Sequence, residues 1–313
     1  MALSDFDKYF LHLPPLYREK DFDSFWDKAI AEIKKIPIEP LLKKDQKKST
    51  NAFTVYDTHF TGFTKTKISG TIFVPNRNKK PNAIVYIHDY NNLRRFDQNV
   101  LDESMAYFFL TLRGHDVLDQ IQGEDVKSPG FIIENILDRD TYYAKAVYLD
   151  VFRSIDMLRL ISDVNCSSIG IIGTGFGAAA AIFTAIRTNR VTALVLDAPS
   201  FCYFPLSQNI STSDATNEIN EFLAGSKGKK KDIKKNLSYF DALNFSDRIT
   251  CPVLVITGFK DTISPPECVF ALFNHIMTEK VMEVYPDEGY GAGGENQFKK
   301  SIQWLVGKIS ALA

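Results

Sequence analysis

The segment IGIIGTGFGAAAA, residues 169–181, decides the fold because its pattern changes within a few residues. Its first part is rich in isoleucine, which is typical of a strand buried on both faces of a parallel sheet. Glycines at positions 173, 175 and 177 follow, and a run of alanines, the strongest helix formers, comes directly after them. The segment therefore predicts a strand, a sharp turn and a helix in direct succession.

The chain repeats this alternation on both sides of the segment. Short apolar runs predict strands over residues 68–74, 83–87, 106–112, 168–172, 193–196, 253–257 and 281–285. Apolar residues at helical spacing predict helices over residues 139–162, 176–188, 266–276 and 297–308. Strands that alternate with helices indicate an α/β fold, with a mainly parallel twisted sheet covered by helices on both faces.

The chain is expected to form one domain over residues 1–313, because the sequence contains neither an internal repeat nor a low-complexity linker. Residues 1–50 have the pattern of a helical arm, in which Asp21 is the expected N-cap of a helix. Residues from about 201 to 245 interrupt the alternation of strands and helices. We expect them to form a lid-like insertion near the carboxyl edge of the sheet.

The composition excludes several classes of partner. The net charge of −1 gives no general attraction to nucleic acid or to an anionic membrane. No apolar run approaches the ~18 residues of a membrane-spanning helix, and the start MALSDFDKYF does not resemble a secretory signal. We therefore expect a cytoplasmic protein that binds neither nucleic acid nor a membrane. The lysine-rich run over residues 226–235 is then expected to be a solvated helix face.

The four cysteines carry no recognisable metal or redox motif. They form no Cys-x-x-Cys pair and match no zinc spacing, so we expect small buried thiols at Cys166, Cys202, Cys251 and Cys268. We expect neither a bound metal nor a cofactor.

The turn within residues 169–181 has two functional interpretations. The first is the nucleophile elbow Gly-x-Ser-x-Gly, with Gly173 and Gly177 in the flanking places and Gly175 where the nucleophilic serine is required. The second is the dinucleotide fingerprint Gly-x-Gly-x-x-Gly/Ala, completed by Ala178 and by Asp197 at the end of the next strand. That fingerprint normally opens its domain, whereas here it lies past the midpoint. A third, structural interpretation is that the glycines only allow close packing of helix on strand.

Six segments in order along the chain decide between these interpretations. They are REKDFDSFWDKAIAEI (18–33), AIVYIHDYNN (83–92), NILDRDTYYAKAVYLDVFRSID (135–156), LSYFDALNF (237–245), ITGFKDTISPP (256–266) and VYPDEGYGAGG (284–294). With these segments the chain resembles, nearly end to end, the acetyl xylan esterase and cephalosporin-C deacetylase family of α/β hydrolases. The resemblance implies the α/β-hydrolase fold and an esterase that removes acetyl groups from sugars and related small molecules.

The resemblance also implies a Ser-His-Asp triad in the chain order serine, acid, histidine, and only the acid is retained. The acid falls on Asp261, the nucleophile falls on Gly175, and the base falls on Tyr290. The oxyanion hole would use the backbone N–H groups of Phe176 and Tyr90, which do not depend on the side chain. The bulky Phe176 side chain is a potential obstruction of the pocket. For the acid that has lost its imidazole, we predict a hydrogen bond from Tyr290 to Asp261.

Two functions remain open besides a minor alternative, the dinucleotide-binding protein. The first is a catalytically impaired member of the esterase family that binds a small acetylated or carbohydrate-like ligand. The second is a working ester hydrolase with displaced catalytic residues. In the second function, His88 or His115 would have to replace the base, and Ser200 or Cys202 would have to replace the nucleophile. All four residues follow predicted strands. Thr174, in contrast, is expected to point away from the cleft.

One stretch departs from the family in length. Between Gly114 and Gly130 the chain is several residues shorter than the family that it resembles. Because that stretch helps to build the family's hexamer, a homo-oligomer is an open expectation for this chain.

Overall fold

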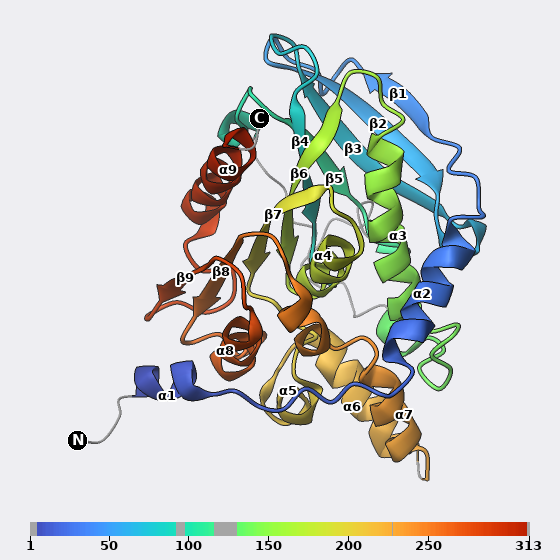
Figure 1. Ribbon diagram of the computed structural model, residues 1–313, viewed down its shortest axis with the longest axis vertical. Coiled ribbons are helices and arrows are strands. Elements are labelled where there is room, and N and C mark those ends of the chain that lie inside the picture. Colours follow the sequence, from blue (N-terminus) through green and yellow to red (C-terminus); the bar gives the residue numbers. More distant parts are fainter. Residues whose placement is uncertain (1–4, 92–97, 116–129, 227, 312–313) are drawn as a thin grey trace.

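A nine-stranded sheet forms the centre of the protein (Figure 1), which is described by a computed structural model over residues 5–91, 98–115, 130–226 and 228–311. The strand order is β1-β2-β3-β5-β4-β6-β7-β8-β9. The strands are β1 (Leu41–Asp45), β2 (Phe53–Thr61), β3 (Lys67–Pro75), β4 (Asn82–Ile87), β5 (Ala106–Leu110), β6 (Asn165–Thr174), β7 (Val191–Asp197), β8 (Val253–Gly258) and β9 (Lys280–Tyr285). The strands from β5 to β9 run parallel, whereas β1, β2 and β3 pair antiparallel with their neighbours.

Helices cover both faces of this sheet, which confirms the predicted α/β-hydrolase architecture. The helices α3 (Tyr143–Leu158) and α4 (Phe176–Arg187) lie on one face with α2 (Phe22–Ile33), and α8 (Pro266–His275) packs near β8. On the other face α9 (Gly294–Ser310) packs against β6 and β7. A separate cluster of buried apolar side chains lies on each face of the sheet, and every central strand contributes side chains to both clusters.

The central elements agree with the sequence prediction, because each has a clear apolar pattern. Strand β6 and helix α4 meet at Gly175, where residues 169–181 predicted the turn. The helix α3 begins and ends inside the predicted range 139–162, and β4, β7, β8 and β9 lie within a few residues of their predicted ranges.

The prediction of a helical arm over residues 1–50 is wrong in its last part. After α1 (Asp5–Leu11) and α2, the chain forms β1, which pairs antiparallel with β2 at the edge of the sheet. The LLKKD sequence of β1 is largely exposed and has no alternating pattern, so it carried no strand signal. Asp21 does not cap α2 with its side chain, because its carboxylate accepts hydrogen bonds from Arg139 and Tyr239 instead.

Residues 201–245 form a group of helices between β7 and β8. They contain α5 (Phe204–Ile210), α6 (Asp214–Gly225), α7 (Lys230–Leu237) and the start of a 3-10 segment, η5 (Ala242–Arg248). The lysines of α7 are exposed, while its Ile233 and Leu237 are buried. The lysine-rich run is therefore a solvated helix face over its described residues, as predicted.

Candidate functional site

The predicted site residues gather where parallel strands end. Gly175 follows β6, Asp261 follows β8 and Tyr290 follows β9. The loop after β4 brings Tyr90 to the same edge of the sheet, together with Asp89, which the sequence analysis did not single out. The carboxyl ends of parallel strands are the usual place for ligands in open α/β sheets.

Gly175 has the backbone conformation of a sharp strand-to-helix turn. Its φ of 54° and ψ of −120° are conformations that a residue with a Cβ rarely adopts. The helix α4 begins at the next residue, Phe176, whose backbone N–H has no acceptor within the helix and points to the loop after β4. This geometry is that of an elbow whose central residue has no side chain.

The carboxylate of Asp89 fills the space above Gly175. Its Oδ1 accepts hydrogen bonds from the backbone N–H groups of Phe176, at 2.6 Å, and Tyr90, at 2.7 Å. Its Oδ2 accepts a hydrogen bond from the hydroxyl of Tyr290 at 2.5 Å. A Cβ on residue 175 would overlap this carboxylate. The two N–H groups expected to form an oxyanion hole are thus already hydrogen-bonded within the protein.

The predicted hydrogen bond between Tyr290 and Asp261 is wrong. The tyrosine hydroxyl donates to Asp89, while Asp261 Oδ1 accepts from the backbone N–H groups of Ile263 and Ser264, both at 2.8 Å. Asp261 Oδ2 is buried and has no hydrogen-bond partner among the described residues. The physical reason is that Asp89 offers the hydroxyl of Tyr290 a buried carboxylate oxygen, whereas Asp261 is held by its own turn.

Burial is the main cause of the shifted pKa values of Asp89, Asp261 and Tyr290. It raises the pKa of Asp89 to about 6 against the lowering effect of its three donors, and the charge of Asp261 raises it further. Burial also raises the pKa of Asp261 to about 6. The pKa of Tyr290 lies well above its ordinary value, first because of burial and then because of Asp89. Tyr290 is therefore a neutral hydrogen-bond donor near neutral pH.

The Phe176 side chain does not obstruct the cleft. It is fully buried and packs beneath the turn against Phe201, with ring centroids 4.8 Å apart, and against Tyr148. The expectation of an obstructing phenylalanine is therefore wrong, since the group above Gly175 is the carboxylate of Asp89.

A pocket of about 210 Å³ opens beside the Asp89 carboxylate. Side chains of the loop after β4, of α6 and of the loops after β7, β8 and β9 line it. The lining residues are Asp89, Tyr90, Asn91, Ser200, Thr212, Ser213, Asp214, Ala215, Ile263 and Tyr290. Hydroxyl, amide and carboxylate groups predominate, and no lysine or arginine of the described chain is among them. Such a pocket suits a small polar ligand without negative charge.

Neither histidine considered as a replacement base faces this pocket. His88 is buried, and its Nδ1 donates to the Asp89 carbonyl at 2.6 Å while its Nε2 accepts from the Leu112 N–H at 2.9 Å. Burial lowers the pKa of His88 to about 3. His115 is likewise buried between backbone groups, with a pKa that burial lowers. Both histidines are structural in this geometry.

The replacement nucleophiles differ in their access to the pocket. The hydroxyl of Thr174 is buried and donates to Tyr86, as expected for a side chain that points away from the cleft. Cys202 is buried against the carbonyl of Cys268, and burial raises the pKa of its thiol well above the ordinary value. Ser200 lines the pocket, and its backbone N–H donates to the carbonyl of Gly175 at 3.1 Å.

The geometry also bears on the dinucleotide fingerprint. A pyrophosphate would bind at the N-terminus of α4, where Asp89 now accepts the Phe176 N–H. A Cβ on Gly173 would approach the Cα of Ala178 to 2.6 Å. The glycine is thus required for close packing of α4 on β6, which favours the structural interpretation of this position.

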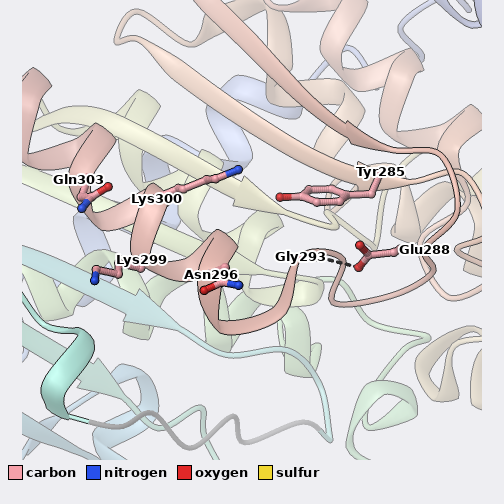
Figure 2. A pocket seen from close by; sticks show the side chains of 7 residues that line it. All are labelled: Tyr285, Glu288, Gly293, Asn296, Lys299, Lys300 and Gln303. Carbon is pink, nitrogen blue, oxygen red and sulfur yellow. Dashed lines mark hydrogen bonds between the residues drawn. The ribbon is translucent and has the colours of Figure 1, made fainter.

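A second, larger groove is lined by the end of β9, the loop that follows it and α9. Its volume is about 600 Å³, and Figure 2 shows the residues that line it between β9 and α9: Tyr285, Glu288, Gly293, Asn296, Lys299, Lys300 and Gln303. Glu288 accepts the N–H of Gly293 at 2.7 Å and so closes the loop. None of the predicted site residues lines this groove, which is an open, solvated face of α9.

The four cysteines are buried free thiols, as predicted. Within the described residues no group of three or more His, Cys, Asp or Glu side chains is arranged to hold a metal ion. The same part of the chain contains no helix that is both long and apolar enough to cross a membrane. The shortened stretch between Gly114 and Gly130 falls largely on residues 116–129, outside the described residues.

The mostly parallel sheet with helices on both faces and the sharp turn from β6 into α4 are the architecture of an α/β hydrolase. The family profile for acetyl xylan esterases (AXE1) matches residues 1–308. The chain therefore belongs to the acetyl xylan esterase family.

Individual proteins agree with this assignment. The acetyl esterase Axe7A of Xylanibacter ruminicola is 24% identical over 302 residues, which cover 93% of this chain and 67% of that protein. The solved acetyl xylan esterase from Paenibacillus sp. R4 has a TM-score of 0.87 and 26% identity, covering 96% of this chain and 98% of its own. Acetyl xylan esterase 1 from Thermoanaerobacterium sp. JW/SL YS485 shares the fold, with a TM-score of 0.82, 22% identity and coverage of 95% and 98%.

Asp89 is the residue that sequence reasoning missed. In lipases and esterases the loop that supplies the second oxyanion N–H is often glycine-rich, of the His-Gly-Gly-Gly type. Here the loop reads His88-Asp89-Tyr90, so an acidic residue follows the histidine directly. That acidic residue, beside a glycine at the nucleophile position, was the available signal.

Proposed function

We propose that this chain is a catalytically impaired member of the acetyl xylan esterase family. In this proposal it binds a small acetylated or carbohydrate-like ligand in the cleft over Gly175 and does not hydrolyse it efficiently. Gly175 has no side chain that could form an acyl-enzyme, and Tyr290 is a neutral donor rather than a base. Asp261 remains as the acid of a triad whose other two members are missing.

The observation that carries the proposal is the position of the Asp89 carboxylate. An enzyme without its triad can keep a residual ~10³–10⁴-fold rate enhancement from the oxyanion hole and substrate binding. Here the N–H groups of Phe176 and Tyr90 both donate to Asp89, so they are not free to stabilise an oxyanion. The geometry thus argues against the residual activity as well as against the full reaction.

The ligand class follows from the family and from the lining of the pocket. Asp214 brings a carboxylate that accepts one hydrogen bond from Asn91 and can accept others from sugar hydroxyls. The hydroxyls of Thr212 and Ser213 are bonded to Thr262 and Thr216 and contribute polar surface. The volume of about 210 Å³ admits a small group such as part of one sugar unit.

An ester assay and a binding assay test the two parts of the proposal. With 4-nitrophenyl acetate we expect no turnover above that of the Asp261→Asn variant; saturable turnover at ~1 s⁻¹ or faster would contradict catalytic impairment. With acetylated xylo-oligosaccharides we expect saturation-transfer NMR signals that Ala215→Phe abolishes, because Ala215 lines the pocket. The matched control is Ala224→Phe, an exposed position on the same helix α6, which should leave binding unchanged.

The alternative of a displaced esterase rests on Ser200, a residue that lines the pocket and whose backbone N–H donates to the carbonyl of Gly175. If turnover is found, Ser200→Ala decides whether that hydroxyl is the nucleophile. Loss of turnover in this variant would favour the displaced esterase, and unchanged turnover would exclude Ser200.

A further inference from the structure

The Asp89 side chain is bound in the manner of a small anionic ligand. Both of its carboxylate oxygens accept hydrogen bonds, from two backbone N–H groups and one hydroxyl. One of these N–H groups belongs to Phe176, at the start of the twelve-residue helix α4, where the helix dipole favours a negative charge. Asp89 itself is only 7% exposed, so this is a buried and fully satisfied carboxylate.

We propose that the donors of Phe176, Tyr90 and Tyr290 form a carboxylate-binding site, and that Asp89 is its tethered occupant. While Asp89 fills the site, it keeps free carboxylates and ester carbonyls from these three donors, although the pocket beside it stays open. Without the Asp89 carboxylate, the same three donors bind a small monocarboxylate such as acetate. Asp89 thereby determines which ligands the cleft accepts. The inference rests on the proposed function only in taking the cleft over Gly175 as the ligand site.

The space at the site agrees with an acetate ion. Asp89→Ala removes one carboxylate group and leaves its three donors in place, since two are backbone groups and the third is on another loop. The pocket of about 210 Å³ begins at Asp89 and Tyr290, so the methyl group of acetate has room on that side. No basic side chain of the described residues lines the pocket, so these three donors are suited to a single carboxylate rather than to a phosphate group.

The test is an acetate titration of the purified chain, its Asp89→Ala variant and the double variant Asp89→Ala/Tyr290→Phe. Sodium chloride holds the ionic strength constant, and the readout is the NMR shift of the Phe176 and Tyr90 amides. We expect saturable shifts in D89A with a Kd on the order of 1 mM, and none in the unchanged chain. Loss of the Tyr290 hydroxyl should weaken binding about tenfold. Acetamide, which has the same shape without the charge, should not bind.

Two results would overturn the inference. One is a folded D89A variant whose two amides do not respond to acetate, and the other is an equal response in the unchanged chain. If D89A does not fold, Asp89→Ser undergoes the same titration under the same criteria, because it also lacks the carboxylate. A negative acetate titration would leave the proposed function untouched, because that function is tested by ester turnover and sugar binding of the unchanged chain.

Discussion

The Asp89 carboxylate occupies the space that a side chain at position 175 would need, so both positions cannot carry a larger side chain at once. Any side chain at position 175 would overlap the Asp89 carboxylate, and that carboxylate in turn holds the donors that an esterase needs. The glycine at position 175 and the carboxylate at position 89 are thus physically coupled. Restoring the serine alone cannot restore the site.

This coupling predicts the outcome of rebuilding the triad. Gly175→Ser/Tyr290→His should remain inactive on 4-nitrophenyl acetate, because Asp89 still occupies the space of the serine side chain and the oxyanion donors. Adding Asp89→Ala should raise turnover by about 10²-fold or more over the double variant, since one oxyanion donor alone is worth ~10²–10³. D89A alone is the control and should stay inactive. A double variant as active as the triple variant would contradict the coupling.

At the scale of elements, α6 is tied to the loop after β4. The hydroxyl of Tyr90 donates to the carboxylate of Glu218 on α6, with oxygen separations of 3.0 and 3.2 Å, and accepts the N–H of Ile132 at 3.0 Å. Asn91 donates to Asp214, also on α6, at 3.2 Å. Helix α6, inserted between β7 and β8, therefore contacts the same loop that carries Asp89.

Tyr90→Phe tests this connection without touching the Tyr90 N–H that binds Asp89. We expect the free energy of unfolding to fall by about 1–3 kcal/mol, because the half-buried Glu218 carboxylate keeps the Gly130 N–H but loses the Tyr90 hydroxyl, and the buried Ile132 N–H loses its acceptor. Urea denaturation measures the change. The control is Tyr56→Phe, whose hydroxyl makes no hydrogen bond within the described chain and which should change stability by less than about 0.5 kcal/mol. Equal effects of the two substitutions would refute the role of Tyr90.

Elements with a strong pattern could be predicted, and those without one could not. Residues 169–181 predicted β6, the turn and α4 because strand, glycine and alanine signals follow one another directly. Strand β1 exposes most of its side chains, and its pairing with β2 depends on the tertiary structure, so local pattern gave no signal. The sequence also placed Gly175, Asp261 and Tyr290 at one sheet edge, but not the hydrogen bond from Tyr290 to Asp89, since side-chain partners depend on distances that spacing does not encode.

At the scale of the whole molecule, buried carboxyl groups and buried histidines have opposite effects on how the stability of the fold depends on pH. Burial raises the pKa of Asp89, Asp150 and Asp261 to about 6 each, so the folded protein holds protons that the unfolded chain releases near pH 4. Burial lowers the pKa of His88 to about 3 and also that of His115, so there the unfolded chain holds the extra protons. Because the two sets oppose each other between about pH 4 and 6, a single carboxyl is best examined by a difference between variants.

Of these three carboxyls, Asp261 is the one with a buried oxygen, Oδ2, that has no hydrogen-bond partner among the described residues. Asp261→Asn keeps an oxygen for the Ile263 and Ser264 N–H groups and removes the charge. Its stabilising effect should be near zero below about pH 4, where the carboxyl is protonated in both the folded and the unfolded chain. It should grow between about pH 4, where the unfolded chain loses this proton, and about pH 6, the raised pKa of Asp261 in the folded protein. Above about pH 6 it should level off at about 1–3 kcal/mol, measured by urea denaturation at each pH.

Asp241 is the matched control for this prediction. It is equally buried, but its two oxygens accept hydrogen bonds from the N–H groups of Tyr203, Phe204 and Leu243 and from the hydroxyl of Tyr17. Asp241→Asn should therefore destabilise the protein at pH 7, because the amide nitrogen faces donors. If D261N also destabilised the protein above pH 7, the retained acid would have a stabilising partner, and its interpretation as an unpartnered remnant of the triad would be wrong.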